Sequence, residues 1–148
     1  YQTINAKILS LYRGNESMNE VEPGASISIE TSLDSFLTKA DSLTGCVVGK
    51  KGTLPEITSN IKIKTELFKE VLGLAESQKK EVEKIKTTEL LMLSVNTTIT
   101  VGTVVKIKDN EIDLLLNIPI VALKGANLGI ASNINSHWRL IGFGEVIG

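Results

Sequence analysis

The feature that most constrains the fold is a succession of short apolar runs rich in Val, Ile and Thr, separated by Gly, Asn, Asp and Pro. Such spacing is typical of an all-β sandwich or barrel. In 25–31 polar and apolar residues alternate, so Ile27 and Ile29 share one strand face, which we expect to be buried. The sequence therefore predicts an all-β protein with little helix. The predicted strands are 4–12, 25–31, 43–48, 60–67, 89–95, 99–107, 112–116, 118–123, 128–132 and 138–143.

The stretch GKKGTLPEI at 49–57 predicts a domain junction, because two Gly, two Lys and a Pro cannot continue a central strand. We expect one domain over 1–53 and a second over 54–148. Within the second, apolar residues of 65–72 recur at helical spacing, so periodicity alone leaves helix or loop open for 65–86. The charged insert at 76–87 is expected to be a solvated linker, because its Glu residues offset most of its Lys residues.

Composition limits the classes of function. The net charge is −1, and Arg13 and Arg139 are the only arginines, which argues against a dedicated sequence-specific nucleic-acid reader. A single cysteine, Cys46, excludes an internal disulfide and indicates a reducing, cytoplasmic setting, and its apolar surroundings predict that it packs within a strand. No apolar run reaches the roughly 20 residues that span a bilayer, so we expect no membrane partner. The start on Tyr1, inside a predicted strand, suggests a piece of a longer chain.

The inventory of catalytic residue types is small. One His and one Cys, far apart in the sequence, predict neither a nucleophile with its base nor a closed zinc site, which needs about four ligands. The phosphate-binding patterns GxxxxGK[ST] and GxGxxG are absent. We therefore expect no catalytic residue, no cofactor and no metal in these residues.

The stretch SHWRLIGFG, from Ser136 to Gly144, contains the only Trp and the only His. Strand alternation places Trp138, Leu140 and Gly142 on one face, which we expect to belong to the core as the barrel's closing strand. His137 and Arg139 then lie on the opposite face, toward the surface.

Two longer stretches carry a family resemblance. Residues 21–57, in which a VEPG turn, an alternating strand, a polar loop and an apolar stretch follow in order, resemble the back part of the second β-barrel of elongation factor Tu-like translational GTPases. Within that class, LTKAD and GTLPEI resemble the gamma subunit of translation initiation factor 2. Residues 88–146, from TELLMLSVNT to HWRLIGFGEV, are similar to the complete third-domain barrel of the gamma subunit of translation initiation factor 2. GTLPEI and ESQKKEVEKIK resemble the eukaryotic form. The resemblance also implies that 65–72 is a strand. The alternatives are a sister factor, either the selenocysteine-specific elongation factor or elongation factor Tu, and an unrelated all-β binding module.

The resemblance implies a role in the cytoplasm. The family's gamma subunit joins the alpha and beta subunits and carries methionyl initiator tRNA to the small ribosomal subunit, with GTP and Mg²⁺ bound by a G domain that these residues do not include. It also implies that the loop 33–41 contacts tRNA or the alpha subunit, with Lys39 on a phosphate and Thr38 and Asp41 shaping the turn. Asp41 could alternatively do no more than cap that turn. His137 and Arg139 would belong to a surface for the family's third-domain assembly factor or for the ribosome.

Overall fold

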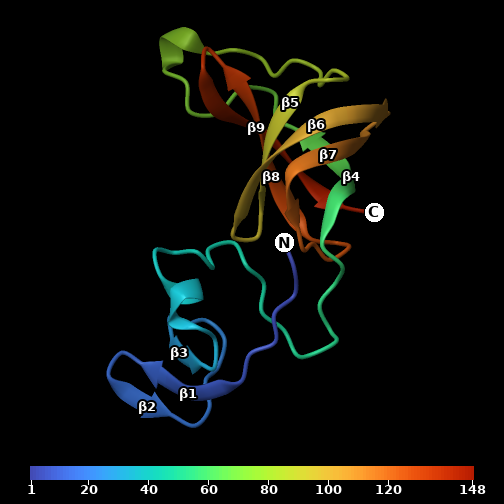
Figure 1. Cartoon of the computed structure of the whole chain (residues 1–148). Coiled ribbons are helices and arrows are strands. Elements are labelled where there is room, and N and C mark those ends of the chain that lie inside the picture. Colours follow the sequence, from blue (N-terminus) through green and yellow to red (C-terminus); the bar gives the residue numbers. More distant parts are fainter. The chain divides into compact units, whose positions relative to one another are not determined.

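The computed structural model describes all residues, 1–148, and nearly all of its regular structure is β-strand (Figure 1). The all-β prediction is therefore confirmed. Two units can be distinguished, Gln2–Thr44 and Gly45–Gly148, the latter together with Tyr1. Their boundary precedes the junction that the sequence predicts within 49–57. No helix of the chain is long or apolar enough to cross a lipid bilayer.

The first unit contains an open three-stranded sheet. Its strands are β1 (Ile8–Arg13), β2 (Glu16–Met18) and β3 (Ser28–Thr31), in the order β2-β1-β3 and all antiparallel. None of its side chains is fully buried, and Ile29 is 44% exposed. The prediction that Ile29 lies on a buried face was wrong, because no second layer of this unit covers the sheet.

The strand predicted at 43–48 does not form. Asp41 and Gly45 both have positive φ, 56° and 82°, and the Thr44 amide donates to the Asp41 carbonyl at 2.9 Å, so the chain turns here. Left-handed backbone cannot continue a strand. Cys46 consequently lies exposed rather than packed in a strand.

The second unit is a closed barrel of six antiparallel strands in the order β4-β7-β6-β5-β8-β9. Tight turns connect three of its hairpins, and Asn96, Asp109 and Asn135 have positive φ in these turns, as expected of Asn and Asp. The barrel strands are β4 (Thr58–Leu67), β5 (Leu90–Val95), β6 (Thr98–Lys108), β7 (Glu111–Ile120), β8 (Asn127–Ile134) and β9 (His137–Val146).

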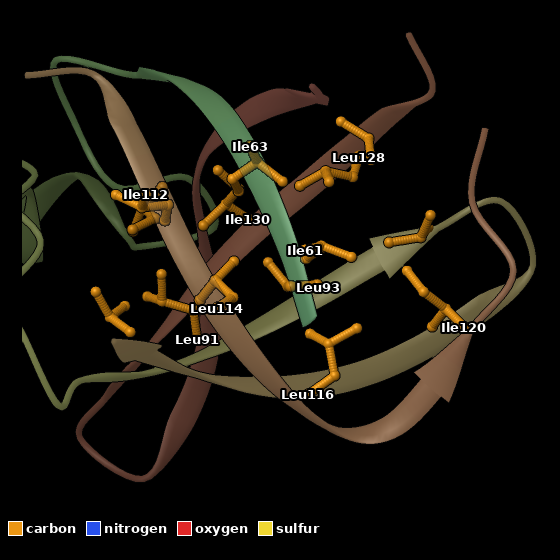
Figure 2. Close-up of a cluster of buried hydrophobic side chains, with 14 of the residues drawn as sticks. Ile61, Ile63, Leu91, Leu93, Ile112, Leu114, Leu116, Ile120, Leu128 and Ile130 are labelled. Carbon is orange, nitrogen blue, oxygen red and sulfur yellow. The ribbon is translucent and has the colours of Figure 1, made fainter. Parts of the chain in front are cut away.

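Alternate residues of the barrel strands form one apolar core. Figure 2 shows that these side chains point toward one another inside the barrel, from strands that lie far apart in the sequence. Ile63, Leu91, Leu93 and Ile130 are completely buried. The alternation that identified strands in the sequence therefore selects the core residues in most of the barrel.

One strand replaces the two predicted over 112–116 and 118–123. β7 continues to Ile120, although its ladder with β6 ends at the pair Gly102 and Leu116. Beyond it the buried Thr100 hydroxyl donates to the Ile118 carbonyl at 2.9 Å and accepts from the Ile118 amide at 3.1 Å. A side chain thus satisfies the backbone groups that the ladder leaves unpaired.

A β-bulge changes which residues of β9 are buried. Ile130 of β8 pairs with Gly142 and Ala131 pairs with Leu140, so Ile141 has no partner opposite it. An extra residue of this kind shifts the alternation of side chains. Ile141 and Gly142 are both buried, while Leu140 is 40% exposed and Trp138 is only half-buried and outside the core cluster. The core assignment was therefore wrong for Leu140 and Trp138, and Gly142 is buried as expected.

The connection between β4 and β5, residues 68–89, is named the strap here. The strand predicted by resemblance over 65–72 ends at Leu67, and the strap contains only a short 3-10 turn, η2 (Glu76–Gln78). The expected solvated linker was wrong in part, because Val82 and Ile85 pack against the core cluster. The charged side chains around them hide this apolar spacing in the sequence.

Barrel closure requires glycine in β9. A Cβ atom at Gly142 would collide with the Glu66 carbonyl oxygen and lie 2.9 Å from the Leu67 Cα, both in β4. Main-chain atoms cannot turn away as a flexible side chain can. At Gly129, in contrast, a Cβ would meet only side chains, at 3.5 Å or more.

Gly142→Ala should separate β4 from β9 and lower the free energy of unfolding by about 3 kcal/mol or more. Gly129→Ala is the matched control, with an expected change within about 1 kcal/mol. Urea unfolding followed by circular dichroism measures both. Equal effects of the two substitutions would contradict the claim that barrel closure requires glycine where β4 and β9 meet.

The bulge leads to a second expectation. Leu93→Ala, at a completely buried position, should lower the free energy of unfolding by about 3 kcal/mol through lost burial and a cavity. Leu140→Ala should lower it by less than about 1 kcal/mol, because much of that side chain already contacts water. If the same unfolding assay gave a loss for Leu140→Ala well above about 1 kcal/mol, the regular alternation of buried side chains would continue through Ile141.

Candidate docking surfaces

The first predicted site, in the unit Gln2–Thr44, is a compact turn. η1 (Ser35–Thr38) begins after Asp34, whose carboxylate accepts from the Phe36 amide at 2.8 Å. The Thr38 hydroxyl donates to the Ser35 carbonyl at 3.1 Å and so closes this short helix. Thr38 therefore takes part in the hydrogen bonding of this turn.

Lys39 and Asp41 follow directly, and both are exposed. The Lys39 and Asp41 carbonyls accept from the Ser42 and Thr44 amides, at 3.1 and 2.9 Å. The turn thus uses the main chain of Asp41, which leaves its carboxylate in contact with solvent. Thr38, Lys39 and Asp41 lie together on one turn, which presents one cation and one anion.

The second predicted site lies at the start of β9, in the barrel. His137 is exposed, and its Nδ1 lies 2.9 Å from the Asn135 carbonyl oxygen, which fixes the ring in the β8–β9 turn. Arg139 differs, because its Nη1 donates to the Gly73 carbonyl of the strap at 2.8 Å. Its Nε is buried without a partner. His137 is thus presented to solvent, whereas Arg139 is largely engaged within the barrel unit.

Charges on the outer barrel wall alternate from strand to strand. Lys62 of β4 pairs in register with Asp113 of β7, which in turn pairs with Lys106 of β6. The Lys62 ammonium lies 3.7 Å from the Asp113 carboxylate and 4.0 Å from that of Glu111. Exposed pairs of this kind contribute at most about 1 kcal/mol each. Opposite charges offset one another, so this wall presents no concentrated basic patch.

Two hollows were not predicted from the sequence. A groove of about 410 Å³ lies between the strap and the β8–β9 hairpin, with Val71, Ile134 and Ile141 among its apolar lining. A shallower hollow of about 480 Å³ on the barrel wall includes Phe68 and Phe143, whose ring centroids are 6.1 Å apart. Phe68 and Phe143 are separated by 75 positions in the sequence, 143 minus 68, so only the β4–β9 pairing brings them together. No group of three or more His, Cys, Asp or Glu side chains is placed to hold a metal ion.

Comparison with known proteins identifies the family. The family described as "Initiation factor eIF2 gamma, C terminal" matches residues 59–146, which include almost the whole barrel. The chain is 40% identical to "Translation initiation factor 2 subunit gamma" of Methanothermobacter thermautotrophicus over 99% of its own length and 35% of that protein. It is 39% identical to the protein of the same name from Methanocaldococcus jannaschii, over 100% of the chain and 36% of that protein.

The chain thus spans about a third of the length of these curated relatives, 35% and 36%. Both relatives are archaeal, so the eukaryotic character expected from GTLPEI stays a prediction. The match and the closed barrel agree on the same residues. This chain belongs to the initiation factor 2 gamma C-terminal family.

Proposed function

We propose that these residues supply docking surfaces to the gamma subunit of translation initiation factor 2, within a GTP-dependent complex that delivers methionyl initiator tRNA to the small ribosomal subunit in the cytoplasm. The supporting observation is 40% identity to a relative with that subunit name over 99% of this chain, together with the family match at 59–146. A subunit name also supports partners of the same factor, which are the alpha and beta subunits in this proposal.

The proposal assigns no bond-making step to these residues. GTP and Mg²⁺ would be bound by the part of the relatives' length that this chain does not span. The chain offers one His and one Cys. His137 is held against a main-chain carbonyl and Cys46 lies exposed, on a turn-and-coil segment.

The turn with Thr38, Lys39 and Asp41 is the first proposed surface, for tRNA or for the alpha subunit. Two observations support it: main-chain hydrogen bonds hold the turn, and Lys39 is exposed to solvent. A main chain that is already ordered loses less conformational entropy when the turn meets a partner.

The start of β9, with His137 and Arg139, is the second proposed surface, for the third-domain assembly factor or for the ribosome. His137 provides the exposed contact. Arg139 lies two residues further along the strand, and its bond to Gly73 couples this surface to the strap.

The intact subunit that contains these residues, assembled with its alpha and beta subunits, should bind methionyl initiator tRNA more tightly with GTP than with GDP. Filter binding of labelled tRNA under both nucleotide conditions measures this difference. Elongator methionyl-tRNA serves as the control ligand. Equal binding of tRNA with GTP and GDP, or no binding under either condition, would overturn the proposed function.

Lys39→Met should weaken either tRNA or alpha-subunit binding by about tenfold, the effect of losing one charge-assisted hydrogen bond of about 1.5 kcal/mol. Lys7→Met is the matched control, because Lys7 is also an exposed lysine of the unit Gln2–Thr44. Binding of each partner is titrated separately. If Lys7→Met has the same effect as Lys39→Met, or if neither partner responds, the assignment of this turn is wrong.

A further inference from the structure

The strap folds into two limbs that lie against the barrel. The Val71 amide donates to the Lys80 carbonyl at 2.9 Å, and the Val82 amide donates to the Lys69 carbonyl at 3.1 Å. The first limb continues onto β9, because the Leu72 amide donates to the Leu140 carbonyl at 3.1 Å. Figure 1 shows the strap passing over the end of the barrel beside the β8–β9 hairpin, with η2 at its outer bend.

Arg139 fastens the strap where its first limb ends. Its Nη1 donates to the Gly73 carbonyl at 2.8 Å, and a charged donor makes this bond stronger than a neutral one. Gly73 has φ of 82°, and a Cβ there would lie 3.2 Å from Nη1. Glycine therefore allows both the turn and the approach of the guanidinium. The buried Nε of Arg139 has no partner, so the position of the strap seen here leaves one donor unsatisfied.

Glu89 fastens the other end of the strap. Its carboxylate accepts from the Lys86 amide and from the Ser132 hydroxyl of β8, each at 2.9 Å. The neighbouring Thr88 has φ of 66°. This conformation is strained for a β-branched residue, at about 1 to 3 kcal/mol. The Glu89 bonds therefore hold an end whose backbone is under local strain.

The charged middle of the strap makes ion pairs only with itself. Glu83 is paired with Lys80 at 2.9 Å and with Lys86 at 3.6 Å. A hydrogen bond from Lys80 and the charges of Lys80 and Lys86 hold the pKa of Glu83 below its usual value. None of the strap's ion pairs reaches a barrel strand. Attachment to the barrel therefore depends on both fasteners, on main-chain bonds to β9 and to Val104 of β6, and on apolar contacts, including that of Val71.

We propose that the strap covers part of the barrel and opens as a unit while the barrel stays folded. Arg139 and Glu89 are the residues that hold the strap in position. The groove of about 410 Å³ has walls from both the strap and β8–β9, so it exists in this form only when the strap is closed. Opening would uncover Val71, which is 6% exposed in the closed state, and the apolar side chains beneath it. Arg139 also belongs to the second proposed surface, but the test of this inference involves no partner, so its outcome does not depend on docking there.

Native-state hydrogen exchange of the unaltered full chain in low urea tests the proposal. The Leu72 and Thr88 amides, which donate to the Leu140 and Val104 carbonyls of the barrel, should exchange through an opening with little urea dependence, because a local opening exposes little surface. The Leu91 and Leu93 amides of β5 should follow the steep urea dependence of global unfolding. If the strap amides follow the same steep dependence as β5, the strap does not open separately and the proposal fails.

Substitutions identify the fasteners. Arg139→Met and Glu89→Gln should each accelerate exchange of the strap amides by about tenfold, while the β5 amides change by less than twofold. Arg139→Lys should restore part of the protection, because a lysine ammonium can also donate to a carbonyl. Lys124→Met, at an exposed position in the connection between β7 and β8, is the matched control and should leave strap exchange unchanged. Unchanged strap exchange in the fastener variants, or equal acceleration throughout the barrel, would overturn the role of Arg139 and Glu89.

Discussion

Closure of the barrel along the pairing of β4 with β9 is the constraint on which the rest of this structure depends. The two strands approach so closely that a Cβ at Gly144 would lie 2.7 Å from the Lys64 carbonyl oxygen, and the same restriction applies at Gly142. These glycines let the first and last barrel strands complete the wall around the core. β4 thereby positions the beginning of the strap beside β9, where the Phe68 amide donates to the Ile141 carbonyl at 2.8 Å.

Much of the barrel could be predicted from the sequence, because strand alternation and turn chemistry are local properties. Asn96, Asp109 and Asn135 mark hairpin turns, and the buried residues of β5 and of most of β7 lie at alternate positions, as strand alternation predicts. The order of the strands around the barrel does not follow from alternation, because it depends on contacts between distant segments. Family resemblance predicted a complete barrel over these residues, which the structure bears out, but it predicted no strand order.

The errors have identifiable physical causes. Leu140 was assigned to the core because alternation cannot reveal a bulge at Ile141. The strand at 43–48 fails because Asp41 before it and Gly45 within it adopt left-handed backbone, and strand alternation does not register either turn. Arg139 was expected at the surface, yet its partner is a carbonyl 66 positions away, in a connection whose fold the sequence left open. The candidate docking residues themselves were identified through the family, and Thr38, Lys39, Asp41 and His137 are exposed.

The two units also differ in how they present main-chain hydrogen-bonding groups. The barrel is closed, so each of its six strands has a neighbour on both sides. In the first sheet, β2 and β3 each pair only with β1. Their outer edges carry the free amides and carbonyls that can template the addition of a foreign strand. Self-association of this chain by strand exchange or fibril growth would therefore begin at β2 or β3. The barrel would take no part in it.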